Sequence, residues 1–165
     1  MLCLRSFNQT AIMKLLEIES SILPWVCGTG KWMSVFVAER FKQSNSSLTI
    51  EQWLVLKLLH REDGLMQNEI AEITNRSKTS LTRLIHTMEK HYLVARMPDK
   101  IDKRVNRIFL TKNGMNVFEA ALPIIAEVRK DLESGLTDRE IKLLINALKK
   151  VQENIETIKS SCTTN

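Results

Sequence analysis

Apolar residues recur every three to four positions through most of the chain, and this spacing predicts a mainly helical protein. Polar segments interrupt the pattern at residues 44–47 and at Asp63-Gly64, which are typical of a loop and a turn. We expect Pro24 and residues 28–30 to end a first helix. The predicted helices cover residues 10–23, 31–42, 49–61, 67–74, 77–91, 111–134 and 137–158.

The helices predicted over residues 67–74 and 77–91 are short and closely spaced. Asn75 tolerates the left-handed backbone of a tight turn, and Ser77 is a suitable N-cap for the second helix. Two short helices joined by such a turn predict a helix-turn-helix. The second helix has an apolar stripe of Leu81, Leu84, Ile85 and Met88 and an opposite, polar face of Thr79, Arg83, His86 and Lys90.

Two runs rich in Val, Ile, Tyr and Phe follow, over residues 92–97 and 106–110, and predict paired strands. The connection between them carries Lys100, Lys103 and Arg104. A helix-turn-helix followed by a basic β-ribbon is a winged helix. The predicted fold class is therefore mainly α with a small β-wing, in which N- and C-terminal helices flank a winged helix-turn-helix.

The last predicted helix repeats its apolar residues every seven positions, which is the pattern of a coiled-coil seam. The two rows are Ile141, Leu148, Ile155 and Leu144, Val151, Ile158. An internal core helix and a subunit interface both fit this pattern. We favour the interface, because the helices outside residues 49–112 carry more apolar surface than one small domain can cover. The expected organisation is dimerisation helices over residues 1–48 and 113–165 around a winged helix-turn-helix domain over residues 49–112.

Positive charge is concentrated on the predicted winged helix. Residues 76–112 carry ten Lys and Arg against three acidic residues, and the rest of the chain carries 14 basic against 16 acidic residues. A basic segment on a slightly acidic body is the electrostatic footprint of a nucleic-acid surface. A solvated charged face is the alternative interpretation.

Composition narrows the classes of function. The 165-residue chain has three dispersed cysteines and no stretch that approaches the roughly 18 apolar residues of a membrane span. No secretory signal is evident, so we expect a cytoplasmic protein with reduced thiols and no membrane partner. His60, His86 and His91 lack metal-ligand spacing, and neither a phosphate-binding loop nor a nucleophile motif occurs. We therefore expect neither an enzyme nor a cofactor.

The predicted wing carries a specific motif, in which Asp102-x-Arg104 is followed by five residues, Leu110-Thr111, two residues and Gly114. This run resembles the wing signature of the MarR (multiple antibiotic resistance regulator) family. Residues 67–72 and 77–84 resemble the first helix and the recognition helix of that family's DNA-reading motif. The resemblance, over about residues 31–158, implies a homodimer that binds a pseudo-palindromic, inverted-repeat operator in double-stranded DNA. Such proteins are usually repressors, and many are released by small aromatic ligands.

The resemblance also implies which residues contact DNA. Arg83 is expected to read a base, and Arg104 is expected to enter the minor groove while Asp102 holds the shape of the wing. Met66 stands where the family often has a capping Ser or Thr, so the first short helix is expected to begin at Gln67 or to fray. Arg76 stands where the family often has an apolar residue, and its charge, like that of Lys103, is expected to face phosphate. The candidate DNA-binding residues are Arg76, Ser77, Lys78, Thr79, Ser80, Thr82, Arg83, Lys103 and Arg104.

Two further hypotheses concern regulation and the class of partner. Candidates to line an effector pocket are Trp32, Phe36, Trp53 and His60, although aromatic residues at helical spacing are more often core residues. Cys27 is expected to be an inert thiol rather than a redox sensor. The alternative function is a winged-helix module that dimerises and docks a protein. The polar recognition face argues against it, because docking faces expose apolar anchors.

Overall fold

The computed structural model describes residues 18–162, and every structural statement below concerns that part of the chain. The chain divides into two compact units, and the boundary between them lies between Ile125 and Ala126. The first predicted helix, over residues 10–23, lies largely outside the described residues. None of the described helices has the length and apolar character needed to cross a membrane.

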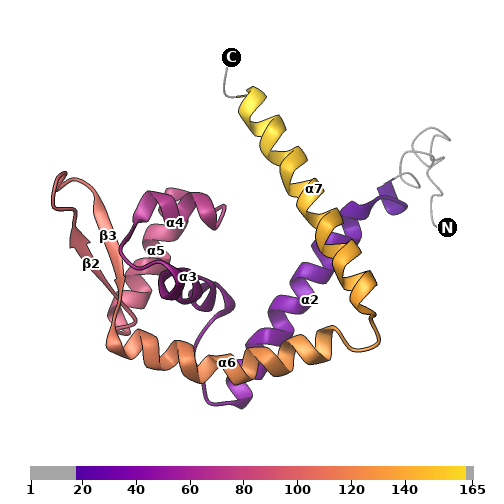
Figure 1. Ribbon diagram of the computed structural model, residues 1–165, viewed down its shortest axis with the longest axis horizontal. Helices are drawn as coiled ribbons and strands as arrows, with labels where there is room; N and C mark the ends of the chain where they lie inside the picture. Colours follow the sequence, from indigo (N-terminus) through magenta and orange to yellow (C-terminus); the bar gives the residue numbers. More distant parts are fainter. Residues whose placement is uncertain (1–17, 163–165) are drawn as a thin grey trace, which may run out of the picture. The chain divides into compact units, whose positions relative to one another are not determined.

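The winged helix lies within the first unit and confirms the predicted fold class (Figure 1). Its sheet has the order β1-β3-β2, and both pairings are antiparallel. Ile108 of the central strand pairs with Leu65 on one side and Arg96 on the other, and its side chain is fully buried. The elements in chain order are α3 (Ile50–Arg61), β1 (Leu65–Met66), α4 (Gln67–Ile73), α5 (Lys78–Lys90), β2 (Val94–Pro98) and β3 (Asn106–Leu110).

The core of the winged helix forms where α3, α4, α5 and β3 meet. Leu81, Ile85 and Met88 of α5 have no exposed surface, and Leu84 beside them is half-buried, so the predicted apolar stripe is confirmed. The other fully buried core side chains include Val55, Leu56, Ile70 and Ile108. Burying one such side chain stabilises the fold by about 1.5–3 kcal/mol.

Side-chain caps define where the helices of the winged helix begin. The pattern Thr49-x-x-Gln52 predicts a capping box, and the structure has it complete at the start of α3. Ser77 Oγ accepts a hydrogen bond from Ser80 N at 3.2 Å and caps α5. Helix α4 begins at Gln67 without a side-chain cap from Met66, but the Glu69 carboxylate accepts the Met66 N–H at 2.6 Å. Half of a capping box therefore survives where the capping hydroxyl is absent.

The prediction that Pro24 and residues 28–30 interrupt the first helix is wrong. Helix α2 runs without a break over Ile22–Gln43, with Ser21 as its N-cap. Pro24 is the third residue of α2, and the N–H groups of a first helical turn have no intrahelical partner, so proline removes no bond there. The interruption between helical segments lies instead just before Ile22, at the N-cap Ser21.

Three local predictions in the winged helix also need correction. The two-residue strand β1 was not predicted, because so short an element leaves no alternating pattern. Strand β2 begins at Val94, since Tyr92 has a φ of 55° and belongs to a left-handed turn after α5. The helical spacing of Ile70, Ala71 and Ile73 predicts that all three face the core, but Ile73, at the last position of α4, is 56% exposed.

Two carboxylates hold the loop of the wing. Asp99 Oδ1 accepts the backbone N–H groups of Ile101 and Asp102 at 2.8 and 3.1 Å, and its Oδ2 accepts a short hydrogen bond from Arg107 Nε. Arg107 also donates to the Gly64 carbonyl at 2.9 Å, which ties the wing to the turn before β1. Asp102 Oδ1 accepts Arg104 N at 2.9 Å. The guanidinium and the two amides together lower the pKa of Asp99 to about 2.

The long C-terminal helices are α6 (Lys112–Leu132) and α7 (Asp138–Cys162). Thr111 Oγ1 accepts Gly114 N at 2.9 Å and caps α6, and Thr111 N donates to the Leu93 carbonyl at 3.2 Å. This contact brings the first turn of α6 against Leu93, just before the beginning of β2, and explains the Leu-Thr-x-x-Gly part of the wing motif. At the start of α7, the pattern Thr137-x-x-Glu140 predicts a capping box, and both of its hydrogen bonds are present.

Replacing Gly114 with alanine is expected to destabilise the protein by about 1–3 kcal/mol. A Cβ atom at Gly114 would lie 2.0 Å from the Leu93 carbonyl oxygen, so the backbone would have to move. Gly28→Ala is the matched control, because a Cβ atom there meets nothing within 4 Å, and it is expected to stabilise α2 by about 0.5–1 kcal/mol. Chemical denaturation measures both free energies of unfolding, and equal effects of the two substitutions would contradict the close packing at Gly114.

Asp99 is expected to make the stability of the protein depend on acid pH. Its folded-state pKa of about 2 lies below the ordinary value of 3.8, so its stabilising contribution is present above about pH 4 and declines as pH falls toward 2. The difference in unfolding free energy between the wild type and Asp99→Asn should therefore be constant from pH 7 to pH 5 and shrink below about pH 4. Denaturation at a series of pH values measures it; a constant difference throughout would show that the carboxylate is not held in this way.

Candidate nucleic-acid interface

The outward face of α5 is polar and accessible. Because Leu81, Ile85 and Met88 anchor the opposite side, the helix presents a row of hydroxyl and basic groups to solvent. The exposed residues are Lys78, Thr79, Ser80, Thr82, Arg83, His86, Thr87 and Lys90. This row contains five of the nine candidate DNA-binding residues, and Ser77 lies at its beginning as the cap.

Arg76 lies at the edge of this face and is half-buried. One guanidinium nitrogen lies 3.9 Å from Glu51 Oε1 of α3, and the other donates to Ser80 Oγ at 3.4 Å. The contact with Glu51 was not expected, since it joins residues 25 positions apart. A partly exposed pair of this length contributes little to stability, so Arg76 can exchange Glu51 for another anion at small cost.

The beginnings of α4 and α5 and the end of the wing loop enclose a concavity of about 290 Å³. Lys78 of α5 and Arg104 of the wing both line it, although they lie 26 positions apart in the sequence. Every lining residue except Val105 has a side chain that can donate hydrogen bonds. The lining residues are Gln67, Asn68, Lys78, Arg104, Val105 and Asn106. Such a site has the chemistry to hold a phosphate group.

Sequence reasoning missed three side chains of this concavity, namely Gln67, Asn68 and Asn106. Gln67 Nε2 donates to Thr82 Oγ1 at 2.8 Å, which links α4 to the exposed face of α5. A neutral amide side chain does not add to the count of charges along the sequence. Its place in the concavity is known only from the folded structure, which brings α4 and β3 together.

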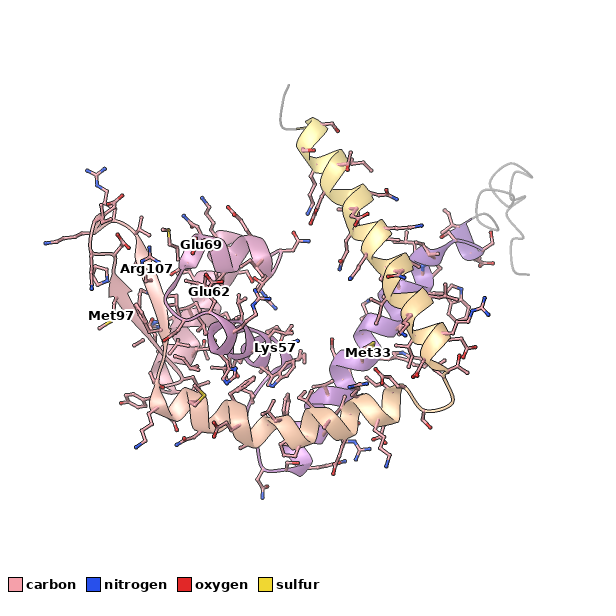
Figure 2. All side chains as sticks on the ribbon, viewed as in Figure 1. Met33, Lys57, Glu62, Glu69, Met97 and Arg107 are labelled. Atoms are coloured by element: carbon pink, nitrogen blue, oxygen red, sulfur yellow. The ribbon has the colours of Figure 1, made fainter. Side chains whose placement is uncertain are left out.

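The positive charge available to a partner is smaller than the count of basic residues indicates. Arg107 is engaged by Asp99 and the Gly64 carbonyl, and the Arg96 guanidinium lies 3.2 Å from Glu89 Oε2. Figure 2 labels Arg107 on β3 and Met97 on β2, two residues that are paired directly across the strands of the wing. The remaining basic residues of the segment are Arg76, Lys78, Arg83, Lys90, Lys100, Lys103, Arg104 and Lys112, and all but the half-buried Arg76 are exposed.

The four candidate pocket residues do not meet in one cavity. His60 and Trp53 of α3 both stack on Phe118 of α6, with ring centroids 4.6 and 6.4 Å apart, respectively. His60 and Phe118 line a cavity of about 640 Å³, together with Lys57, Arg61 and Arg76 among others. Trp32 borders a separate hollow on α2 beside Trp25, and Phe36 lies under the Arg40 guanidinium at 5.1 Å. Phe118 was not among the candidates, because its helical spacing on α6 is also that of a core residue.

Metal ligands and thiols are the other groups of chemical interest among the described residues. Residues 18–162 contain no cluster of His, Cys, Asp and Glu that could hold a metal ion. Cys27 is a free, exposed thiol on α2.

Comparison with known proteins gives a consistent result. Residues 48–105 match the model of the MarR family. HosA of Escherichia coli O157:H7, a transcriptional regulator, is 28% identical over 112 residues, which are 68% of this chain and 83% of that protein. The crystal structure of the transcriptional regulator SlyA is 26% identical, covers 82% of this chain and 94% of its own, and has a TM-score of 0.73. The structure of Staphylococcus aureus MepR in complex with DNA is 25% identical, covers 92% of this chain and 99% of its own, and has a TM-score of 0.64.

The family model and the similar structures agree with the wing motif, the helix-turn-helix and the flanking helices described above. The match of the family model begins just before α3 and ends in the wing. Residues 48–105 are therefore a winged helix-turn-helix that matches the MarR family, and most of the chain is similar to transcriptional regulators of this fold.

Proposed function

We propose that this chain is a transcriptional repressor that binds an inverted-repeat operator in double-stranded DNA as a homodimer. The concavity between α5 and the wing carries the proposal, since it joins Lys78 and Arg104 on one surface beside the polar face of α5. An α-helix fits the major groove, and a thin ribbon reaches the adjacent minor groove. A DNA phosphate between the two grooves would then face the donors of the concavity.

Each candidate residue has a role in this arrangement. Arg83 lies midway along the exposed face of α5 and is the proposed base-reading residue, because its guanidinium can bond a guanine at two positions. Short residues before it, Thr79 and Ser80, allow the helix backbone to approach the bases. Lys78, Lys103 and Arg76 contact phosphates, and Arg104 enters the minor groove from a loop that Asp99 and Asp102 hold in shape.

Apolar residues exposed on two helices support the homodimer. On α2, Trp25 and Trp32 are 73% and 81% exposed, and the seam of α7 includes Leu144 at 55% and Ile158 at 62%. Large exposed apolar surfaces of this kind mark association sites. We propose that residues 1–48 and 113–165 supply the dimerisation helices and that residues 49–112 form the DNA-binding domain.

The cavity beside Phe118 supports the proposal of a small aromatic effector. His60 and Phe118 supply its aromatic wall, and Arg76 lines it while also contacting Ser80 in the first turn of α5. A ligand that displaces or binds Arg76 would alter the start of the recognition helix. Ligand binding at this cavity would thereby lower affinity for DNA.

Selection from a random duplex library tests the proposed function directly. The full chain is expected to enrich an inverted repeat whose half-sites are about one helical turn apart. Binding of the selected duplex should fall steeply as salt rises, because phosphate contacts release counterions. The absence of any enriched sequence would contradict the proposal and favour a winged helix that docks a protein.

In Arg83→Ala, the same selection is expected to lose its preference at one position of each half-site, because the residue that reads that base is absent. A uniform loss of affinity for all sequences would instead make Arg83 a phosphate contact.

Arg104→Ala is expected to weaken binding of the selected duplex by about 1–3 kcal/mol. Arg139→Ala is the matched control, because Arg139 is exposed on α7 outside the winged helix and its loss changes the net charge equally. Affinity by fluorescence anisotropy and mass by light scattering should show the loss only in Arg104→Ala, with both variants retaining the oligomeric state of the wild type. Equal affinities for the two variants would remove the wing from the interface.

A further inference from the structure

The hydroxyl group of Thr82 is engaged within the winged helix, although Thr82 lies on the exposed face of α5. Its Oγ1 donates to the Lys78 carbonyl at 2.8 Å and accepts a hydrogen bond from Gln67 Nε2 at 2.8 Å. A carbonyl oxygen only accepts, so the single hydroxyl proton is committed to Lys78. Gln67 can therefore bond to this hydroxyl only through its NH2 group.

This pair of bonds fixes the direction of the Thr82 side chain. A helical threonine divides between two χ1 rotamers, because its hydroxyl can bond a carbonyl of the preceding turn. The bond from Gln67, which lies on α4, adds to the stability of the rotamer present here. With its proton committed, Thr82 cannot donate to an acceptor on a base. The γ-methyl group remains as its apolar contact group.

We propose that Thr82 recognises a thymine through contact between its γ-methyl group and the thymine 5-methyl group, and that Gln67 is the positioning residue for this contact. The inference rests on the proposed function, because it assigns the chemistry of one contact in the same interface. The thymine methyl group lies in the major groove, where threonine methyl groups are suitable partners. Thr82 thereby adds a preference for thymine that hydrogen bonds alone would not provide.

The test uses the full chain and the duplex recovered by library selection. Each thymine of a half-site is replaced in turn by deoxyuridine, which exchanges the methyl group for hydrogen and leaves the pairing edge unchanged. One position is expected to lose affinity by about fourfold, the equivalent of one buried methyl-sized group. The other positions should change less.

Two substitutions of Thr82 separate the methyl group from the hydroxyl. Thr82→Ser keeps both hydrogen bonds and loses the methyl group, so it should bind the thymine duplex about fourfold more weakly and be indifferent to deoxyuridine at that position. Thr82→Val keeps the methyl group and is stiff at χ1, so it should retain the deoxyuridine penalty. Both side chains stay exposed, so neither variant disturbs the core.

The role of Gln67 is tested by rescue. Gln67→Ala is expected to reduce the deoxyuridine penalty, because Thr82 is then free to leave its rotamer. Adding Thr82→Val to that variant should restore the penalty, since valine needs no partner to hold its χ1 angle. A merely structural role of Gln67 at the start of α4 would instead lower affinity for both duplexes equally, without restoration by valine.

Failure of this inference is distinguishable from failure of the proposed function. A selectively bound duplex without a methyl-sensitive thymine would overturn the methyl contact, as would an unchanged deoxyuridine penalty in Thr82→Ser. The operator and the role of the winged helix would then still stand. If no duplex is enriched in the selection, the proposed function fails, and the Thr82 contact fails with it.

Discussion

The rotation of α5 about its own axis determines what the winged helix can present to a partner. Leu81, Ile85 and Met88 are fully buried against α4 and the sheet, and each contributes about 1.5–3 kcal/mol to the fold. A rotated helix would expose these three side chains and would force charged groups such as Arg83 into the core, where an unpaired charge is very costly. The polar face of α5 is therefore held outward by apolar packing on the other side.

The wing can act together with α5 because the wing is itself constrained. Asp99 accepts hydrogen bonds from two backbone amides and pairs with the Arg107 guanidinium. Arg107 also donates to the Gly64 carbonyl, which links this loop to the turn before β1. At the other end of the ribbon, Thr111 and Gly114 bring α6 against the Leu93 carbonyl. These contacts give Arg104 a defined place near Lys78, so that a helix and a loop distant in sequence form one polar concavity.

Charged residues in the basic segment have two separate uses. Arg96 and Arg107 are paired with carboxylates inside the winged helix, whereas Lys78, Arg83 and Arg104 remain exposed. A count of charges along the chain locates the basic segment but does not distinguish these groups. The same holds for the aromatic residues, because Trp53 and His60 meet at Phe118 while Trp32 and Phe36 lie elsewhere on α2.

The sequence by itself determined the faces of α5, the caps at Thr49 and Ser77 and the β-wing, because periodicity and capping depend on residues within about one helical turn. The resemblance to the MarR family followed from the wing motif, and the match of the family model to residues 48–105 confirms the resemblance. The continuity of α2 through Pro24 was missed, since it depends on where the cap lies. Only the tertiary structure decided strand β1, the Asp99–Arg107 pair, the Gln67–Thr82 bond and the concavity between Lys78 and Arg104. Each of these depends on contacts between separate turns, strands or helices, and such contacts arise from packing that no local pattern records.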